Sequence, residues 1–371
     1  MSPLPRSAFP VVDRWAWLNH AGTGPLPTPA VDAMAARARA QSLEGGRAWD
    51  DHLARQAEVR AAAARLLGVP DDDVAFVRST TDGLALAAEG LGLRAGDRVV
   101  LPDCEFPSNV YCWTALRERG VTVDLVALDR LLDAVATGPA PAVVACSWVQ
   151  FGRGERTDLA ALAAAAHEVG ALLVVDAIQG AGVLPAALEA WGVDVAAADG
   201  HKWLLGPEGC GLLYVRGSVR DRLRPVSPGW NSVAHRQEWE NRELVHDPSA
   251  RRYEGGTPNT VGIAGLGASL DLLLAAGVDS VWRHVDRLCD RVAGGVAALG
   301  ATVLSDRTPG RRSGIVTFRF EGGIRNGDLV DRLHGQGVAT AARGGGVRVS
   351  PHGYTTDEEA DRLLAALADV A

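Results

Sequence analysis

The stretch LAALAAAAHEVGALLVVDAIQ, residues 159–179, places a helix pattern directly before a strand pattern. Its alanine-rich half has high helix propensity, and the run ALLVVD that follows is apolar and β-branched, as is typical of a buried strand. The strand pattern ends at Asp176, where a carboxylate follows five apolar residues. A helix pattern that leads into a buried strand is typical of α/β proteins.

The same alternation recurs from about residue 55 to residue 215. The strand patterns there are VAFVR, RVVLP, VTVDLV, AVVACS, ALLVVD, VDVAAAD and CGLLYV. Seven such runs with helical stretches between them predict an α/β fold, with a large, mostly parallel seven-stranded sheet covered on both faces. The reactive residues of such a sheet gather where its strands end and its loops begin.

The rest of the chain has a different pattern. A stretch rich in Pro, Arg and Trp, from about residue 217 to residue 260, indicates irregular structure. Beyond it lie two helical segments, the strand patterns GIVTFRF and VRVS, and a last helical pattern, TDEEADRLLAALADV. This order predicts a smaller α+β domain at the C-terminal end.

The bulk composition limits the kinds of partner. The chain of 371 residues is 47% hydrophobic and 22% charged, with a formal charge of −8 and a pI near 5.6. These values are typical of a globular protein with an ample core. No segment supplies the basic patch that a nucleic-acid or anionic membrane surface needs. We therefore expect small-molecule partners, no nucleic acid and no membrane.

The cysteines and the N-terminal residues indicate a compartment. The five cysteines, at positions 104, 112, 146, 210 and 289, fall in no CxxC or Cys/His ligand spacing. This pattern predicts no disulfide and no metal site in a reducing environment. The start MSPLPRSAFPVV lacks a signal peptide's apolar core, and no apolar run approaches the roughly eighteen residues of a membrane span. We expect a cytoplasmic protein.

Lys202 is the only lysine of the chain. Lys and Arg number 37 together, so 37 minus this one leaves 36 arginines. A composition rich in Ala, Gly and Arg indicates a GC-rich coding source, which explains the arginines but not the single lysine. An amine forms Schiff bases and becomes a nucleophile when its pKa falls, whereas a guanidinium stays charged. We therefore interpret Lys202 as a chemical group.

Three further features stand at strand ends. Thr80 and Thr81 open a helix after a strand, where free N–H groups and the helix dipole bind anions, although plain helix capping is commoner. Asp176 ends a buried strand and needs a positive partner unless it caps the next turn. His201 and Lys202 share the next such loop. An anion cradle, a carboxylate and an amine are together what pyridoxal phosphate (PLP) requires.

The ordered motifs resemble fold-type I PLP enzymes of the aminotransferase class V family, which includes cysteine desulfurases, selenocysteine lyases, isopenicillin N epimerase-like proteins and kynureninases. The resemblance spans nearly the whole chain. It rests on LNHAGTGPLP (18–27), STTDG (79–83), EFPSNVY (105–111), VDAIQ (175–179), DGHKWLLGPEG (199–209), YEGGTPNT (253–260) and VRVSPHGYTTDEEADRL (347–363).

The resemblance implies a division of the chain and an assembly. Residues 51–255 would form the large PLP-binding domain and residues 256–371 the small C-terminal domain. Residues 1–50 would be a segment that packs with the small domain and lines the active site. A homodimer with a shared active site is implied as well.

The resemblance also implies roles at the cofactor. Lys202 would hold PLP as an aldimine and act as catalytic acid and base, and His201 would assist in catalysis. Asp176 would pair with the pyridine nitrogen, and Gln179 would hydrogen-bond the phenolic oxygen. The phosphate ligands that the resemblance implies are Thr80, Thr81, His201 and, from the other subunit, Thr257.

Three more residues receive roles at the ring and the substrate. Phe106 would stack on the ring, where desulfurases usually have histidine and kynureninases phenylalanine. Arg348 would clamp the substrate carboxylate by a bidentate pair, and Trp230 would contact the substrate. Core packing explains Phe106 and Trp230 equally well, and a turn role explains Thr257 equally well.

Two departures from the family pattern bear on the reaction. Asp199 stands three positions before the lysine, where the family often has Ser or Thr, and its charge would repel a phosphate unless it points elsewhere or is compensated. The desulfurase cysteine that carries a persulfide is missing from the short segment ATAARGGGVRVS. We therefore favour a β-eliminating C–S lyase that acts on the α-carbon of a cysteine-like amino acid, with a class V aminotransferase or an epimerase as the alternative.

Two other classes of protein fit the sequence less well. A nicotinamide or nucleotide binder would use glycine-rich turns such as GPEGCG (206–211) or GIAGLG (262–267), but neither matches GxGxxG after a strand with an acidic residue about twenty positions on. A scaffold without catalysis would have no reason to retain the sole lysine beside its expected partners.

Overall fold

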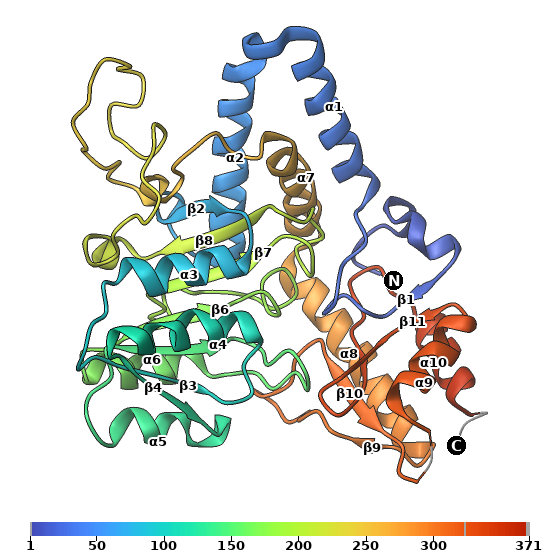
Figure 1. The fold of residues 1–371 in the computed structure, drawn as a ribbon. Helices are drawn as coiled ribbons and strands as arrows, with labels where there is room; N and C mark the ends of the chain where they lie inside the picture. The colour runs from blue at the N-terminus through green and yellow to red at the C-terminus, as the bar shows by residue number, and fades with distance from the viewer. Residues whose placement is uncertain (1, 323, 369–371) are drawn as a thin grey trace.

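A seven-stranded sheet forms the centre of the molecule, which this computed structural model describes for residues 2–322 and 324–368 (Figure 1). Its strand order is β2-β8-β7-β6-β5-β3-β4. The strands are β2 (Val74–Val77), β3 (Arg98–Pro102), β4 (Thr122–Val126), β5 (Val143–Ser147), β6 (Leu172–Asp176), β7 (Val195–Asp199) and β8 (Gly211–Val215). Within this sheet β8 runs opposite to all the other strands. The predicted α/β fold with a large, mostly parallel sheet is confirmed.

Helices cover both faces of the sheet because its strands alternate two sets of buried side chains. In β2, Phe76 belongs to one hydrophobic core and Val77 to the other. Side chains of α3 (Thr80–Gly90) and α4 (Pro107–Thr114) complete the core on Val77's side. The opposite core receives α2 (Trp49–Leu67), α5 (Leu131–Ala136), α6 (Leu159–Glu168) and α7 (Thr260–Ala276).

The N-terminal part of the chain reaches across the molecule. The strand β1 (Ala16–Trp17) pairs in parallel with β11 (Val338–Ala339), so the two ends of the chain meet in one small sheet. The helix α1 (Thr28–Glu44) then leads to a turn at Gly45–Ala48, which stands out from the body at the top of Figure 1, and α2 returns to the sheet.

The C-terminal part contains a four-stranded antiparallel sheet of order β12-β13-β10-β9. Its strands are β9 (Thr302–Val303), β10 (Val316–Arg319), β12 (Ala341–Arg343) and β13 (Gly346–Val349). The helices of this part are α8 (Val278–Ala298), α9 (Asn326–Gly335) and α10 (Asp357–Ala368). The predicted last helix runs as α10, and its expected final residues, 369 and 370, lie outside the described residues.

The stretch between the short 3-10 helices at Gly217–Arg222 and Ala250–Tyr253 is irregular, as its composition predicted. It projects to one side of the sheet (Figure 1). Among the described helices, none taken singly has the length and apolar composition of a membrane span. The pair α7 and α8 meets that test only when taken together, by length and composition alone, and is bent by 80° at its break.

Candidate functional site

A cavity of about 300 Å³ opens where β6 and β7 end, beside the first turn of α3. Parallel strands present their carboxyl ends at one edge of a sheet, so side chains that follow different strands meet there. Residues of the N-terminal segment and of the β12–β13 hairpin close it from outside. Eight of the ten residues that the sequence indicated line this cavity: Thr80, Thr81, Phe106, Asp176, Gln179, His201, Lys202 and Arg348.

The N-terminal segment packs directly against the loop of the lysine. The N–H group of Gly24 donates to the carbonyl oxygen of His201 at 2.7 Å. A Cβ atom on Gly24 would lie 2.3 Å from the carbonyl oxygen of Lys202, so a larger residue does not fit without backbone movement. Ala21 and Gly22 of the same segment line the cavity.

Lys202 follows β7 and lies mostly buried in the cavity. Its Nζ is 5.5 Å from the centroid of the Phe106 ring. Burial lowers the pKa of Lys202 to about 8, and the positive charge of Arg348 lowers it further, while the carboxylates of Asp176 and Asp199 oppose the shift. An amine with this pKa is partly neutral near pH 7 and so accepts a proton readily.

Asp176 is the last residue of β6, and only 3% of its surface is exposed. Its Oδ1 accepts a hydrogen bond from the N–H group of Ile178 at 3.0 Å. Burial raises the pKa of Asp176 to about 6, and the Ile178 N–H group and Lys202 act against that shift. Both roles that the sequence left open are therefore present: Asp176 caps the next turn through Ile178, and Lys202 is the positive group that favours its charged form.

Gln179 is held in one orientation by two neighbours. Its Nε2 donates to the carbonyl oxygen of Ala21 at 3.0 Å, and its Oε1 accepts from the indole Nε1 of Trp203 at 2.8 Å. The second hydrogen of Nε2 is left for an acceptor in the cavity. Trp203, fully buried next to Lys202, was not identified from the sequence, although it adjoins the lysine in the motif HKW.

The start of α3 forms an anion cradle. Ser79 caps the helix by accepting the N–H group of Asp82 at 3.1 Å. The N–H groups of Thr80 and Thr81 lie in the first turn, where no intrahelical acceptor exists. The hydroxyl of Thr80 accepts from the N–H group of Asp199 at 2.9 Å, so its own hydrogen stays available to an incoming anion.

The carboxylate of Asp199 makes two contacts of its own and is not free to turn toward the cradle. Its Oδ1 accepts the N–H group of Gly200 at 2.7 Å, and its Oδ2 lies 3.1 Å from Nδ1 of His201. The second contact has the distance of an ion pair but an angle that leaves Nδ1 without a formal hydrogen bond. The carboxylate of Asp199 thus faces its own loop and Nδ1 of His201.

Arg348, in β13, lies on the far side of the cavity and is only 3% exposed. Its Nη1 donates to the carbonyl oxygen of Phe151 at 2.6 Å, and its Nη2 to Oδ1 of Asn19 at 3.4 Å. Its buried Nε has no hydrogen-bond partner among the described residues. Burial lowers the pKa of Arg348 to about 10, and Arg343, an exposed residue of the same cavity, contributes. The guanidinium is therefore short of an acceptor.

Glu105 is a buried carboxylate directly before the cavity residue Phe106, and the sequence did not single it out. Its Oε1 accepts the N–H group of Ser147 at 2.7 Å, and its Oε2 accepts the hydroxyl of Ser147 at 2.5 Å and Nδ2 of Asn109 at 2.9 Å. Ser147 lies beside Asp176 in the register of β5 and β6. Burial raises the pKa of Glu105 to about 7. Its place directly before Phe106 in EFPSNVY was the only available signal.

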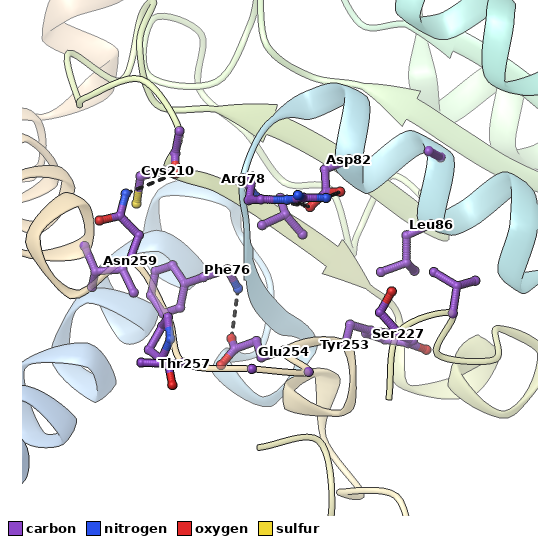
Figure 2. Close-up of a pocket in the computed structure, with 18 of the residues that line it drawn as sticks. Phe76, Arg78, Asp82, Leu86, Cys210, Ser227, Tyr253, Glu254, Thr257 and Asn259 are labelled. Atoms are coloured by element: carbon purple, nitrogen blue, oxygen red, sulfur yellow. Dashed lines mark hydrogen bonds and ion pairs between the residues drawn. The ribbon is translucent and has the colours of Figure 1, made fainter. Parts of the chain in front are cut away.

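Thr257 and Trp230 lie outside the cavity of Lys202. Thr257 lines a separate cavity of about 480 Å³ with Phe76 and Glu254, and Figure 2 shows these side chains around it. Trp230 contacts Trp49 and Trp239, with ring centroids 6.3 and 5.7 Å apart. Thr257 was expected to act from the other subunit, so its place in a single chain leaves that prediction untested. Trp230 does not reach the cavity of its own chain.

The residues around the Lys202 cavity fit PLP. The cradle at α3 suits a phosphate, Asp176 is a buried carboxylate that suits a protonated ring nitrogen, and Gln179 retains a free donor. Lys202 is an amine with a lowered pKa beside the exposed face of an aromatic ring. The unpartnered Nε of Arg348 suits a carboxylate.

Comparisons with known proteins agree with this fit. The family model described as aminotransferase class V matches residues 16–363. A probable cysteine desulfurase of Methanothermobacter thermautotrophicus is 31% identical over 99% of this chain and 97% of its own length. The structure of a C-DES lysine-to-alanine variant, with glycine covalently linked to its PLP cofactor, has a TM-score of 0.92 and 25% identity, covering 98% of this chain and 99% of that one. The cystine C–S lyase C-DES with its product cysteine persulfide has a TM-score of 0.90 and 26% identity, covering 97% and 99%.

Proposed function

Because this chain belongs to the aminotransferase class V family and is a PLP-dependent enzyme, we propose that it is a C–S lyase that eliminates the β-substituent of a cysteine-like amino acid. The sulfur-containing product leaves into solution and is not carried by a cysteine of the protein. Relatives of two kinds support this choice: cysteine desulfurases, and a neighbour that is a cystine C–S lyase.

In this proposal, Lys202 holds the cofactor covalently through Nζ. Asp176 pairs with the pyridine nitrogen, Gln179 donates to the phenolic oxygen, and Phe106 stacks on the ring. The phosphate ligands within one chain are Thr80, Thr81 and His201. When bound, PLP withdraws electrons from the substrate's α-carbon, which makes the Cα proton acidic and allows a group to leave from Cβ.

The chain's own residues divide the remaining work. Arg348 binds the substrate carboxylate through paired N–H donors and so orients the Cα–H bond toward Lys202. Once the substrate's amine has taken its place on the cofactor, the freed Nζ of Lys202 would accept the Cα proton, because its lowered pKa of about 8 leaves part of the amine neutral near pH 7. Asp176 holds a proton at the ring nitrogen by its charge. The N-terminal segment at Ala21 and Gly22 limits access of water.

One observation carries the choice of a lyase that does not relay sulfur through the protein: the five thiols are poorly suited to form an accessible thiolate. Burial raises the pKa of all five cysteines, to about 11 for Cys104 and about 12 for Cys112, Cys210 and Cys289, and well above the ordinary value for Cys146. A persulfide carrier needs an accessible thiolate. No cysteine lines the Lys202 cavity among the described residues.

The proposal includes a homodimer in which a second copy completes the site. Thr257 lies on a cavity wall next to the first strand of the sheet, away from its own Lys202. Trp230 is 37% exposed on the projecting irregular stretch. In this proposal both residues reach a neighbouring copy, Thr257 toward its phosphate and Trp230 toward its substrate. The proposal also divides the chain into an N-terminal segment (residues 1–50), a large PLP-binding domain (51–255) and a small C-terminal domain (256–371).

Spectra and product analysis test the proposal. The purified protein with PLP should have a visible absorbance band that is absent from Lys202→Arg, which keeps the positive charge but cannot attach the cofactor. Cysteine or cystine should then yield pyruvate, ammonia and a sulfur product, with no need for a thiol acceptor. Transfer of the amino group to a keto acid, or racemisation without sulfur release, would instead select the aminotransferase or the epimerase.

A further inference from the structure

Asp199 and His201 form a carboxylate–imidazole contact in the wall of the Lys202 cavity. Their side chains are 7% and 22% exposed, and Oδ2 and Nδ1 are 3.1 Å apart. Nδ1 is buried, and Oδ2 is the acceptor that faces it. Nε2 makes no hydrogen bond to any described residue, so it is the nitrogen that remains for a ligand. His201 therefore has the fixed carboxylate of Asp199 at Nδ1 and a free Nε2 in the cavity that also contains the anion cradle of α3.

The tautomer of His201 decides what Nε2 does. A neutral imidazole carries one hydrogen, and a carboxylate next to Nδ1 favours placing that hydrogen on Nδ1. Nε2 is then an acceptor, which repels an anion. Nε2 becomes a donor only when the ring takes up a second proton. Without Asp199, the neutral ring would be free to carry its hydrogen on Nε2.

We propose that Asp199 is a positioning residue that couples anion binding in the α3 cradle to uptake of one proton by His201. The inference rests on the proposed function, in which the anion is the phosphate of PLP. In the bound state Nδ1–H of His201 faces Asp199, and Nε2–H donates to the phosphate. The positive imidazolium then lies between the negative carboxylate and the negative phosphate. A serine or threonine at position 199 would contact the anion directly and create no such coupling.

Other ionisable groups face this part of the cavity, and the test has to separate them. Lys202 follows His201 in the same loop, Asp176 ends the neighbouring strand β6, and Arg343 and Arg348 come from the hairpin. In α3, Asp82 is paired with Arg78 at 2.6 Å. Covalent attachment at Lys202 would add its own proton exchange, so the measurements use full-length protein in a Lys202→Met background.

Sulfate is the first probe because it stays dianionic across the working range, whereas a phosphate ester titrates near pH 6. Its affinity is measured by competition against pyridoxal phosphate from pH 6 to pH 9. With Asp199 and His201 intact, the affinity should fall by up to about tenfold per pH unit where the ring loses its proton, as expected for uptake of one proton. In Asp199→Asn and in His201→Gln the affinity should be flat, and about tenfold weaker at pH 6.

The double variant supplies the sharper test. If Asp199 acts through His201, Asp199→Asn should cost nothing in a His201→Gln background and should tighten binding there, because it removes an uncompensated carboxylate. Tighter binding by Asp199→Asn alone would overturn the proposal, since Asp199 would then only repel the anion. Equal losses in both backgrounds would overturn it too.

Calorimetry distinguishes this inference from the proposed function. Heats of sulfate binding in buffers of different ionisation enthalpy should report about one proton taken up, and none in either single variant. Urea unfolding midpoints identify a variant that fails to fold, and His201→Asn then replaces His201→Gln. A protein that binds sulfate with this proton uptake but has no Lys202-dependent absorbance would refute the PLP roles and leave the coupling standing. A protein with that absorbance but no proton uptake would refute the coupling alone.

Discussion

Nζ of Lys202 lies 5.5 Å from the centroid of the Phe106 ring, over its face. The two residues follow strands that are not neighbours in the sheet. Lys202 follows β7, and Phe106 lies between β3 and α4, while β6 and β5 separate β7 from β3. Phe106 is 39% exposed and is held edge-on by Phe151, with centroids 5.2 Å apart at 81°. A supported but exposed aromatic ring beside a reactive amine is suited to stacking on a flat cofactor.

Replacing Phe106 should therefore weaken the cofactor without unfolding the protein. We expect Phe106→Ala to raise the dissociation constant of PLP about tenfold, because stacking of aromatic rings contributes about 1 kcal/mol beyond burial. Phe106→His keeps a flat ring and should lose less. Equilibrium titration of the cofactor-free protein measures both. Unchanged affinity in Phe106→Ala would remove Phe106 from the set of cofactor contacts.

Lys202 should destabilise the cofactor-free protein in a pH-dependent way. Burial lowers its pKa from 10.5 to about 8 in the folded state. Between pH 8 and pH 10.5 the lysine is therefore protonated in the unfolded chain but neutral in the folded protein. The free energy of unfolding consequently rises with pH across this range. Lys202→Met should be more stable than the wild type by up to about 3 kcal/mol at pH 7.

Urea unfolding at two pH values checks this expectation. The advantage of Lys202→Met should be full below pH 8 and should disappear near pH 10.5. Taking the difference between variant and wild type cancels the titration of other groups. A difference that is the same at both pH values would mean that the folded protein does not lower the pKa of Lys202.

Arg348 should act on substrate binding more than on the cofactor. A lysine cannot reproduce the paired donors of a guanidinium, so Arg348→Lys should raise KM for the amino acid about a hundredfold, with a smaller change in kcat. The absorbance of bound PLP should not change. Arg343→Lys is the matched control, since Arg343 lines the same cavity but is exposed. A larger increase in KM for Arg343→Lys would mean that Arg343, and not Arg348, binds the substrate carboxylate.

Glu105 should contribute mainly to stability. Glu105→Ala leaves the Ser147 N–H group, the Ser147 hydroxyl and the Asn109 amide without their acceptor in a buried place. We expect a loss of about 3 kcal/mol in the free energy of unfolding. Asn109→Ala, which removes one of the three donors, should cost clearly less. Urea unfolding of the two variants at pH 8, above the pKa of about 7 for Glu105, measures the difference.

The buried ion pair between Arg60 and Glu254 should respond asymmetrically to substitution. Nη1 of Arg60 lies 2.8 Å from Oε1 of Glu254, and the side chains are 9% and 4% exposed. Glu254→Gln should cost about 3 kcal/mol because it leaves a buried charge unpaired. The double change Arg60→Met with Glu254→Met should cost less than the single one. If instead the double change costs the sum of two singles, the charges are not coupled.

The Arg60–Glu254 pair also bears on the expected second copy of the chain. Glu254 accepts the N–H group of Phe76 at 2.8 Å, which ties the start of GGTPNT to the first strand of the sheet. Thr257 follows three residues later (Figure 2). A weaker cofactor affinity in Glu254→Gln, beyond its effect on stability, would support a role of this loop in the shared site.

The sequence by itself determined the seven strands, the α/β class and the placement of Lys202 and Asp176 at one edge of the sheet. Strand and helix patterns depend on local periodicity, and parallel strands bring their carboxyl ends to one edge whatever their order. Any reactive residue directly after such a strand is therefore placed by the local pattern alone. Thr80 was found in the same way, since it follows a strand closely, whereas Gln179 was indicated by the resemblance to the family.

Only the tertiary structure decided the contacts between segments far apart in the chain. Glu105 meets Ser147 across 42 residues, and Gln179 meets Ala21 across 158. The direction of the Asp199 carboxylate depends on His201 and on the turn between them, which no periodicity encodes. Trp230 and Thr257 lie on irregular chain, whose course is set by packing against α2 and the sheet. Local patterns thus specify which residues reach the sheet edge, and long-range packing specifies which of them touch.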